Sequence, residues 1–366
     1  MHTSQFKYEK IYRELKQMVE SGNYGPDDKL PTEVELSEQY KVSRPTVTRA
    51  LNALRNQNLI TRKAGAGTFV NQSSEKNVKA RRFGLIVPRL GKGEIFEPIC
   101  AQIAARAEEK NFSLLWSASD LQSANPGQSI TAVAKQYISE QVDGVFFEPL
   151  ELDPTFDSVN QKVIDVLDNA GIPVILIDSD YLDYPFRSKH DLVGIDNFRA
   201  GYQVTKYFAD RGNHRIDFLG RPHSAHTVDA RLKGYRSALA DLVGESHKDW
   251  IHIDAPENSS LIDDFLNTGV SCIVCGNDET AATLLSQLEK RRISVPDQIR
   301  VIGFDDVRYA QLLRVPLTTY HQPAKAIGNA ALNLMLWRLE NPDAPVETRM
   351  IEGYIVQRES CGYSGT

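Results

Sequence analysis

The 366-residue sequence lacks any apolar run approaching the roughly 20 residues that a membrane-spanning helix needs. Its first residues, MHTSQFKYEKIYRELK, carry charges where an export signal would be apolar. These two absences argue against membrane insertion and export, so we expect a cytoplasmic protein with no membrane partner. With 41% hydrophobic and 25% charged residues, the composition is that of an ordinary globular protein.

Cysteine is also scarce, and the four that occur suggest a reducing compartment without a disulfide framework. Cys272 and Cys275 have the spacing of a zinc or redox motif. They lie in an apolar strand-like run, however, where residues three apart point to opposite faces of a sheet. His223 and His226 also have metal-like spacing, but no cysteine is near them in the sequence. We therefore expect neither a metal site nor a cofactor.

Acidic residues are absent from residues 41–74, which hold six Lys or Arg. The whole chain has a formal net charge of −6, yet residues 1–82 contain 15 Lys or Arg against 9 Asp or Glu. A small basic module therefore precedes a large acidic one. Basic modules attract phosphate backbones through the release of counterions, although a solvated charged face would have the same composition.

Helical signals dominate the first part of the basic module. Apolar residues at helical spacing predict a helix over residues 8–19. Thr32 and Glu35 have the spacing of a capping box, which predicts a second, short helix that stops near Tyr40. Ser43 is suited to cap a third helix, in whose first turn the following proline is tolerated.

The third helix has two different faces. At about 100° per residue, its apolar side gathers Val47, Ala50, Leu51 and Leu54. Arg49 and Asn52 lie on the opposite side. Two short strands, residues 59–62 and 68–70, follow around a glycine-containing turn. Helices in this order with a terminal hairpin form the winged helix-turn-helix plan.

A helix can read the major groove of DNA where nearby side chains neutralise phosphates and its outer face offers hydrogen-bonding groups to the bases. The third helix and the turn of the hairpin meet these requirements. The residues expected to contact DNA are Lys41, Ser43, Arg44, Pro45, Thr46, Thr48, Arg49, Asn52, Arg62, Lys63, Gly65 and Gly67. The alternative is a three-helix bundle that binds another protein.

This segment resembles the DNA-binding domain of the GntR family of bacterial transcription regulators. The resemblance runs through LPTE, VSRPTV, the AL-x-x-L spacing and GAGTFV, and covers nearly all of residues 6–71. It implies a winged helix-turn-helix that binds operator DNA. Relatives often carry arginine where this chain has Thr48, so their base preference does not transfer to this protein.

The larger remainder alternates short apolar runs with helical patterns. Nine runs are typical of strands, among them GLIVP, GVFFEP, PVILID and RVIGF. Apolar strands that alternate with helices predict parallel sheets covered on both faces, and the length suits two doubly wound subdomains. Polar residues follow these strands at the carboxyl ends, where ligands bind in such sheets. Carboxylates, amides and arginines suit the hydroxyls of a neutral polyol.

The remainder is similar to the effector domain of the LacI/GalR family of sugar-responsive repressors, which itself resembles periplasmic sugar-binding proteins. The matching segments include ARLKGYRSAL, CGNDETA, SVPDQIRVIGFDD and IVQRES. The similarity implies an effector site formed by Phe96, Asp178, Thr227, Arg231, Asn277, Asp305 and Gln322. Several relatives have an aromatic residue where this chain has Ala324, so the partner that stacks on a sugar ring does not carry over.

Each expected effector residue also has a plainer interpretation. Asp305 and Asn277 would suit helix caps, and Arg231 would suit an ion pair on a helix. Phe96 would suit core packing at the start of a helix.

The two resemblances imply an α/β chain with a winged helix-turn-helix domain at residues 1–71, a linker at 72–82 and a periplasmic-binding-protein-like effector and dimerisation domain at 83–366. Such a protein would be a homodimeric repressor released from its operator by a monosaccharide. L-Arabinose or a similar sugar, such as L-fucose, rhamnose, ribose or galactose, is expected. A sugar-processing enzyme and a sugar receptor without DNA binding are the alternatives, but neither a P-loop nor a Gly-x-Ser-x-Gly motif supports an enzyme.

Overall fold

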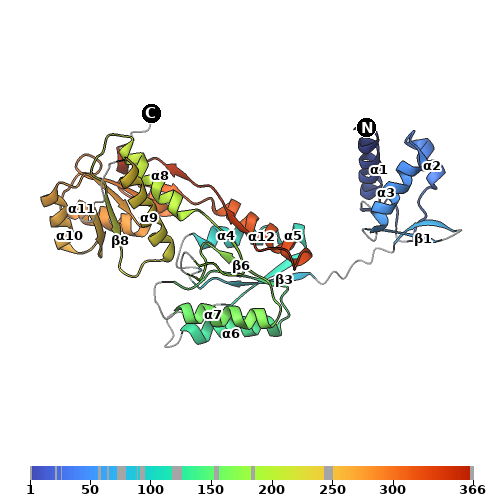
Figure 1. Cartoon of the computed structure of the whole chain (residues 1–366), viewed down its shortest axis with the longest axis horizontal. Helices are drawn as coiled ribbons and strands as arrows, with labels where there is room; N and C mark the ends of the chain where they lie inside the picture. The colour runs from blue at the N-terminus through green and yellow to red at the C-terminus, as the bar shows by residue number, and fades with distance from the viewer. Residues whose placement is uncertain are drawn as a thin grey trace. The chain divides into compact units, whose positions relative to one another are not determined.

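The chain forms two compact units, Met1–Ala80 and Arg81–Thr366 (Figure 1). The computed structural model describes residues 2–20, 23–25, 27–56, 59–63, 66–71, 80–88, 90, 95–117, 126–151, 156–182, 186–242 and 250–362. Gly65 and most of the expected linker, residues 72–79, lie outside these ranges. The second unit begins with a strand at Arg81, so Arg81 and Arg82 belong to a sheet and not to the linker that the sequence suggested.

The first unit is a winged helix-turn-helix. Its elements are α1 (His2–Glu20), α2 (Glu33–Gln39), α3 (Arg44–Asn56) and the antiparallel strands β1 (Ile60–Lys63) and β2 (Gly67–Val70) (Figure 1). The capping box of α2 is present: Glu35 N donates to the Thr32 hydroxyl, and Thr32 N donates to the Glu35 carboxylate at 2.7 Å. The order of helices and hairpin predicted from the sequence is therefore confirmed.

A small apolar core holds the first unit together. Its buried residues are Ile11, Leu15, Leu30, Leu36, Val47, Ala50, Leu51, Leu54, Ile60 and Val70. All four apolar residues assigned to the inner side of α3 are among them. Burial of this side leaves the opposite side of α3 accessible.

Two six-stranded sheets form the second unit. The first sheet has the order β13-β7-β6-β5-β3-β4, and its pairings are all parallel. Its strands are β3 (Arg81–Ile86), β4 (Phe112–Trp116), β5 (Gly144–Phe147), β6 (Val174–Ile177), β7 (Asp191–Gly194) and β13 (Thr348–Met350). The helices packed with it are α4 (Phe96–Ala104), α5 (Ala107–Lys110), α6 (Pro126–Ser139), α7 (Phe156–Asn169) and α12 (Ala324–Glu340). α6 and α7 cover one face, and α4 and α12 cover the other (Figure 1).

The second sheet has the order β14-β12-β11-β10-β8-β9, in which β14 pairs antiparallel with β12 and the other pairings are parallel. Its strands are β8 (Asp217–Gly220), β9 (Ile251–Ile253), β10 (Cys272–Cys275), β11 (Arg300–Asp305), β12 (Thr318–His321) and β14 (Tyr354–Val356). The helices of this subdomain are α8 (Asn197–Ala209), α9 (His226–Leu242), α10 (Ser259–Thr268) and α11 (Asp278–Lys290), with the short 3-10 helices η2 (Arg308–Gln311) and η3 (Glu359–Cys361).

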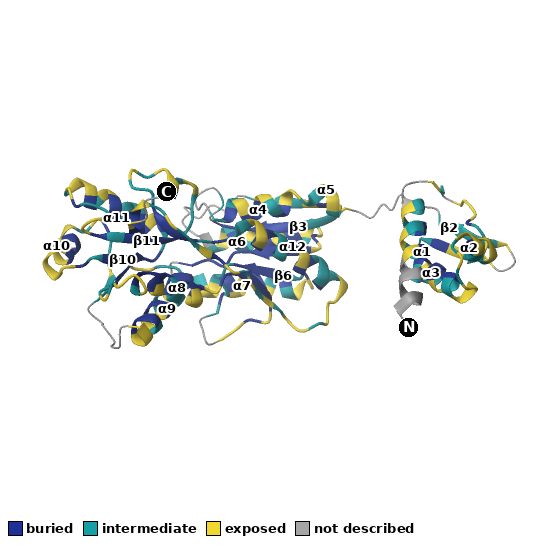
Figure 2. Ribbon diagram, turned by 90° about the horizontal axis from the view of Figure 1, so that it is seen from above, coloured by how far each residue is buried: buried dark blue, intermediate teal, exposed yellow. Residues whose placement is uncertain are grey.

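The chain passes between the two sheets after β7, after β12 and again after β13. The carboxyl ends of the strands in both sheets are therefore brought toward these connections. Figure 2 shows that burial is concentrated on the strands and on the inner faces of the helices. Within the described ranges, no helix is both long enough and apolar enough to cross a bilayer.

Candidate functional site

The accessible side of α3 and the turn before it carry eight of the residues expected to contact DNA, here called the α3 surface. Its exposed members are Lys41, Ser43, Arg44, Pro45 and Arg49. Its partly exposed members are Thr46, Thr48 and Asn52. The sequence thus places hydrogen-bonding and cationic groups on the side of α3 that the core does not use.

Hydrogen bonds fix the turn that leads into α3. Lys41 has a φ of 48°, in the left-handed region that reverses the chain direction between the two helices. Ser37 Oγ donates to the carbonyl of Val42 at 2.6 Å, and Val42 N donates back to the Ser37 carbonyl at 3.1 Å. The hydroxyls of Ser43 and Thr46 lie 2.9 Å apart. These contacts hold the first turn of α3 in one orientation.

Two neighbouring side chains of the α3 surface are engaged within the first unit. Thr48 Oγ1 donates to the Arg44 carbonyl at 2.9 Å. The Arg49 guanidinium carbon lies 4.7 Å from the ring centre of Tyr8 in α1, at cation–π distance. Arg49 is therefore directed toward the junction of α1 and α3.

The wing, β1 and β2, divides its two cations between different environments. Arg62 forms an ion pair with Glu33 at the start of α2. Lys63 Nζ lies 5.1 Å from the ring centre of Phe69 on β2. Gly67 has a φ of 127°, a conformation that side chains with a Cβ rarely adopt. The ion pair of Arg62 thus connects the wing to α2, whereas Lys63 contacts a residue of the wing.

Sequence reasoning missed Lys29, whose Nζ lies 6.0 Å from the same Phe69 ring. Lys29 also forms an isolated antiparallel bridge with Phe69. It lies in the connection before α2, far from the wing in sequence, and no local pattern marks it. The pairing with β2 is what brings this third cation to the wing.

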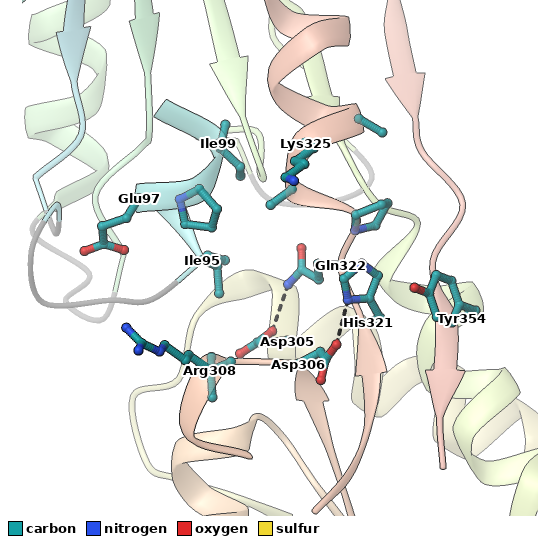
Figure 3. A pocket seen from close by; sticks show the side chains of 15 residues that line it. Ile95, Glu97, Ile99, Asp305, Asp306, Arg308, His321, Gln322, Lys325 and Tyr354 are labelled. Carbon is teal, nitrogen blue, oxygen red and sulfur yellow. Dashed lines mark hydrogen bonds and ion pairs between the residues drawn. The ribbon is translucent and has the colours of Figure 1, made fainter. Parts of the chain in front are cut away.

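The second unit contains a cavity of about 790 Å³ between residues of its two subdomains (Figure 3). It is lined by Ile95, Glu97, Pro98, Ile99, Asp305, Asp306, Val307, Arg308, His321, Gln322, Pro323, Ala324, Lys325, Ala326 and Tyr354. The start of α4 forms one wall, and the ends of β11 and β12 with the start of α12 form the others. Of the expected effector residues, Asp305 and Gln322 line it.

Arg231 connects the cavity lining to Asn197 at the start of α8 and to Gly276 after β10. Its Nε donates to Asn197 Oδ1 at 2.9 Å, and its two terminal nitrogens donate to the Gly276 carbonyl at 2.8 Å and to Asp305 Oδ1 at 3.1 Å. Gln322 Nε2 donates to the same Asp305 oxygen at 2.8 Å. The plainer interpretation of Arg231, an ion pair, is present, and its partner is a residue that lines the cavity.

The remaining four expected effector residues are not part of the cavity lining. Asn277 caps α11, where its Oδ1 accepts from Thr280 N at 2.9 Å. Phe96 is only 2% exposed and belongs to the apolar core. Thr227 is buried in the first turn of α9, and Asp178 follows β6 with a φ of 75°. They are strand-end and helix-start residues, as the sequence indicated, but they do not face this cavity.

Asp278 lies buried behind the cavity at the start of α11. It accepts from Thr319 Oγ1 at 2.6 Å and from Val307 N at 3.1 Å. Burial, followed by the nearby charge of Asp305, raises the pKa of Asp278 well above its ordinary value. Asp278 therefore keeps its proton at pH values where an exposed carboxyl is ionised.

Asp306, which lines the cavity, has the opposite shift. Burial raises the pKa of Asp306, but hydrogen bonds from His321 and Arg358 outweigh burial and lower it below its ordinary value. His321 Nδ1 lies 2.8 Å from one carboxylate oxygen, and Arg358 donates to the other at 2.6 Å. Asp306 is thus an anion held between two cationic or hydrogen-bonding partners.

Sequence reasoning also missed His321 and Tyr354. Their rings lie 4.8 Å apart, and both line the cavity. They belong to β12 and β14, neither of which was predicted as a strand. In the described part of the chain, no group of three or more His, Cys, Asp or Glu side chains is arranged to hold a metal ion.

Two protein-family models match the chain. The model described as "Bacterial regulatory proteins, gntR family" matches residues 7–70. The model described as "Periplasmic binding protein-like domain" matches residues 205–361. The first match covers the winged helix-turn-helix, and the second covers most of the subdomain built on the second sheet, with its connections to the first.

Relatives and solved structures agree with these matches. The arabinose metabolism transcriptional repressor of Geobacillus stearothermophilus is 27% identical over 344 residues, which cover 91% of each chain. The transcription regulator CcpA of Lactococcus lactis has a TM-score of 0.64 at 23% identity, covering 77% of this chain and 99% of that one. A LacI family regulator from Enterococcus faecium with bound ribose has a TM-score of 0.62 at 21% identity, covering 76% and 98%.

The geometry and the comparisons lead to one description of the chain. The first unit has the fold and the sequence match of a DNA-binding domain. The second unit has the two-sheet fold of periplasmic binding proteins. The chain therefore joins a GntR-family helix-turn-helix domain to a periplasmic-binding-protein-like domain, the combination of a transcriptional regulator and not of an enzyme.

Proposed function

We propose that the protein is a sugar-responsive repressor of carbohydrate-utilisation genes. In this proposal the first unit binds operator DNA, and the second unit binds a monosaccharide, L-arabinose or a similar sugar. The observation that carries the proposal is a cavity lined by Asp305 and Gln322 in a chain whose other unit is a winged helix-turn-helix. The similarity to repressors of arabinose metabolism over 91% of the chain supports the same assignment.

The groups at the cavity suit a polyhydroxylated ligand. Asp305 Oδ1 already accepts from Gln322 and Arg231, at 2.8 and 3.1 Å. A sugar hydroxyl both donates and accepts, so it can bond the Asp305 carboxylate and the Gln322 amide within the same arrangement. Ile95 and Ile99 on the opposite wall offer apolar surface to the C–H groups of the ring.

On DNA, we propose that the α3 surface enters the major groove. Lys41 and Arg44, at the start of α3, neutralise phosphates, whereas Thr48 and Asn52 reach base edges. Lys63 on the wing contacts the neighbouring backbone. The absence of acidic residues over residues 41–74 removes the repulsion that would oppose this approach.

Regulation then follows from a population shift. Two copies pair through their second units and bind the half-sites of a near-palindromic operator. Sugar binding between the subdomains favours a closed cleft and lowers the affinity for DNA. A coupling of about 1–3 kcal/mol corresponds to a roughly 5- to 150-fold change in operator affinity. The protein acts in the cytoplasm, where the operator DNA lies.

A mobility shift assay tests this proposal. The purified protein is titrated into the duplex upstream of its own gene cluster and into a random duplex of equal length, with and without each of the five candidate sugars. We expect preferential retardation of the upstream duplex, which L-arabinose or another sugar of the panel reverses. Equal retardation of both duplexes, or binding that no sugar changes, would contradict the proposal.

A further inference from the structure

The segment before α2 pairs with the edge of β2 that β1 does not use. Leu30 N donates to the Thr68 carbonyl at 2.9 Å, and Val70 N donates to the Asp28 carbonyl at 2.8 Å. These two bonds flank Lys29 and its bridge partner on β2, so the pair is of the kind in which antiparallel side chains approach most closely. Lys29 is therefore held beside the wing, although it belongs to neither of its strands.

One face of this three-stranded arrangement carries Lys29, Phe69 and Lys63, and is here called the wing face. Lys29 is opposite Phe69, and opposite residues share a face. Lys63 is opposite Gly67, which precedes Phe69 by two residues and so lies on that face as well. Val70 points to the other face and is buried in the core of the first unit. The wing face is therefore the one turned away from that core.

Two cations lie at the ring of Phe69. Lys29 Nζ is 6.0 Å and Lys63 Nζ is 5.1 Å from the ring centre, and both lysines are exposed whereas Phe69 is half-buried. A Cβ on Gly67 would lie 2.5 Å from Lys29 Cε, so the glycine leaves room for the lysine chain. Two ammonium groups close to one ring repel each other. An anion bound beside both of them removes this repulsion, so the wing face is suited to a negatively charged partner.

Three acidic side chains near the wing face form other contacts. Glu33 pairs with Arg62, whose side chain lies on the other face of the wing. Asp28 accepts a backbone hydrogen bond at 2.6 Å. Glu35 belongs to the capping box of α2, whose hydrogen bonds lower its pKa, and the charge of Lys29 contributes to the same shift. Lys29 itself remains exposed beside these acids and accessible to a partner.

We propose that Lys29 and Lys63 together bind phosphates of the DNA backbone beside the groove that receives α3. The inference rests on the proposed function, because it presupposes that the first unit binds DNA. It adds a residue from outside the helix and the wing that carry the expected contacts. In this arrangement the α3 surface and the wing face act on the same duplex, and Lys29 adds to the affinity without selecting a base sequence.

Fluorescence anisotropy of the full-length protein tests the inference with two labelled duplexes of equal length, the one upstream of its own gene cluster and a random one. Lys29→Met removes the charge and keeps a side chain of similar length. We expect this variant to bind both duplexes more weakly by the same factor. The slope of log affinity against log salt should fall by about one, because one phosphate contact is lost.

Three further variants complete the test. Lys29→Arg keeps the charge and should keep the slope. The double variant Lys29→Met/Lys63→Met should reduce the slope by about two, because both phosphate contacts are lost. Lys10→Met is the matched control, since it removes an exposed cation of α1 that lies 3.8 Å from Glu14, and it should change neither the affinity nor the slope.

The outcomes separate this inference from the proposed function. If the wild-type protein prefers the upstream duplex and Lys29→Met leaves both affinities and the slope unchanged, the inference is wrong and the proposed function stands. A loss confined to the upstream duplex would show a contact with bases in place of phosphates and would also contradict the inference. A loss that Lys29→Arg shares would show that Lys29 supports the fold of the wing, and the inference would again be wrong. If the wild-type protein binds neither duplex, the proposed function and the inference fall together.

Discussion

The guanidinium of Arg231 forms hydrogen bonds to three separate segments around the cavity. It donates to Asn197 after the first connection between the sheets, to the Gly276 carbonyl after β10 and to Asp305 at the end of β11. Asp305 in turn accepts from Gln322, which follows β12 at the second connection. A ligand that replaces one bond at Asp305 therefore alters the contacts of both connections. In the mechanism that we propose, this arrangement couples ligand binding to movement of the subdomains.

Replacing Arg231 should remove the response to sugar. Arg231→Ala deletes a charged donor from Asp305, so we expect the sugar affinity to fall by about 10- to 100-fold. Because a buried charge loses its partner, the free energy of unfolding of the second unit should fall by about 3–5 kcal/mol. Calorimetry measures the first effect. Denaturant titration followed by tryptophan fluorescence measures the second, since all three tryptophans, Trp116, Trp250 and Trp337, lie in the second unit.

Arg236→Ala is the matched control for Arg231→Ala, because Arg236 is an exposed arginine on the same helix. Arg236→Ala should change neither the sugar affinity nor the free energy of unfolding. If Arg231→Ala leaves the sugar affinity unchanged, Arg231 does not contribute to sugar binding.

The buried Asp278 makes the stability of the second unit depend on pH. Its pKa in the folded protein is raised above the ordinary value of 3.8, mainly by burial. Above pH 3.8 the unfolded chain releases this proton while the folded protein retains it, so the contribution to stability is lost as pH rises toward the folded pKa. Asp278→Asn removes the titration. We expect the free energy of unfolding of the variant, relative to wild type, to increase from pH 4 to pH 8.

The comparison of wild type with Asp278→Asn reports on Asp278 together with its interaction with the charges of Asp305 and Asp306. Other carboxyls, such as Asp306 with its lowered pKa, change stability in the opposite sense, but they are shared by both proteins. Urea titrations at each pH, followed by tryptophan fluorescence, give the difference. A difference that stays constant across the pH range would show that Asp278 is ionised in the folded state.

At the scale of elements, helices α8 and α9 pack through glycine. A Cβ on Gly201 would meet the carbonyl of Arg231, and a Cβ on Gly234 would meet the carbonyl of Phe198. The two backbones therefore approach more closely than any other residue type permits. Since Arg231 lies one turn before Gly234, this packing sets the position of its guanidinium.

Gly234→Ala should separate the two helices and displace Arg231. We expect the free energy of unfolding to fall by about 1–3 kcal/mol, as for other overpacked sites, and the sugar affinity to fall with it. Asp241→Ala, at an exposed position of the same helix, is the control and should change neither. Thermal unfolding and calorimetry measure the two effects. Full sugar affinity in a destabilised Gly234→Ala variant would show that helix spacing does not position Arg231.

The sequence predicts strands well where they are continuous apolar runs. All nine runs assigned to the second unit are strands in the structure, β3 to β11. The three that were missed, β12, β13 and β14, have the sequences TTYH, TRM and YIV. β12 buries Thr318 and Thr319, whose hydroxyls bond Arg358 O and Asp278. Such partners come from distant parts of the chain, so no local pattern reveals that these threonines can be buried.

For the candidate site as well, the sequence predicted the residues on apolar strands and missed those on the other strands. Asp305 ends a strand that the apolar pattern identifies, so its place at the carboxyl end of the sheet was predicted. His321 and Tyr354 lie on two of the missed strands and were not. The stacking of Arg49 on Tyr8 and the ion pair of Arg62 with Glu33 also depend on tertiary packing. Local sequence patterns identify side chains at an edge or face, but not the neighbours that bind them.

The uneven distribution of charge along the chain suits one unit to DNA binding and the other to ligand binding. The basic residues that precede Arg81 serve attraction to DNA, whereas the rest of the chain carries the excess of acid. An acidic second unit does not add nonspecific contacts with the phosphate backbone. The contribution of single cations in the first unit is therefore measurable against a low background.

Arg44→Ala should weaken operator binding by about tenfold and reduce the slope of log affinity against log salt by about one, because one phosphate contact is lost. Arg44 is exposed at the first position of α3. Lys10→Ala is the control, since Lys10 is an exposed cation on α1 that pairs with Glu14 at 3.8 Å. Fluorescence anisotropy at several salt concentrations provides both numbers. An unchanged affinity and slope would place Arg44 outside the interface.

In the proposed function, sugar binding and operator binding are linked through the same molecule, and such linkage is reciprocal. Calorimetric titration of the full-length protein with L-arabinose, alone and saturated with operator duplex, measures this linkage. We expect the sugar to bind more weakly to the DNA complex, by the same factor, about 5- to 150-fold, by which the sugar weakens operator binding. An identical sugar affinity with and without DNA would contradict the account.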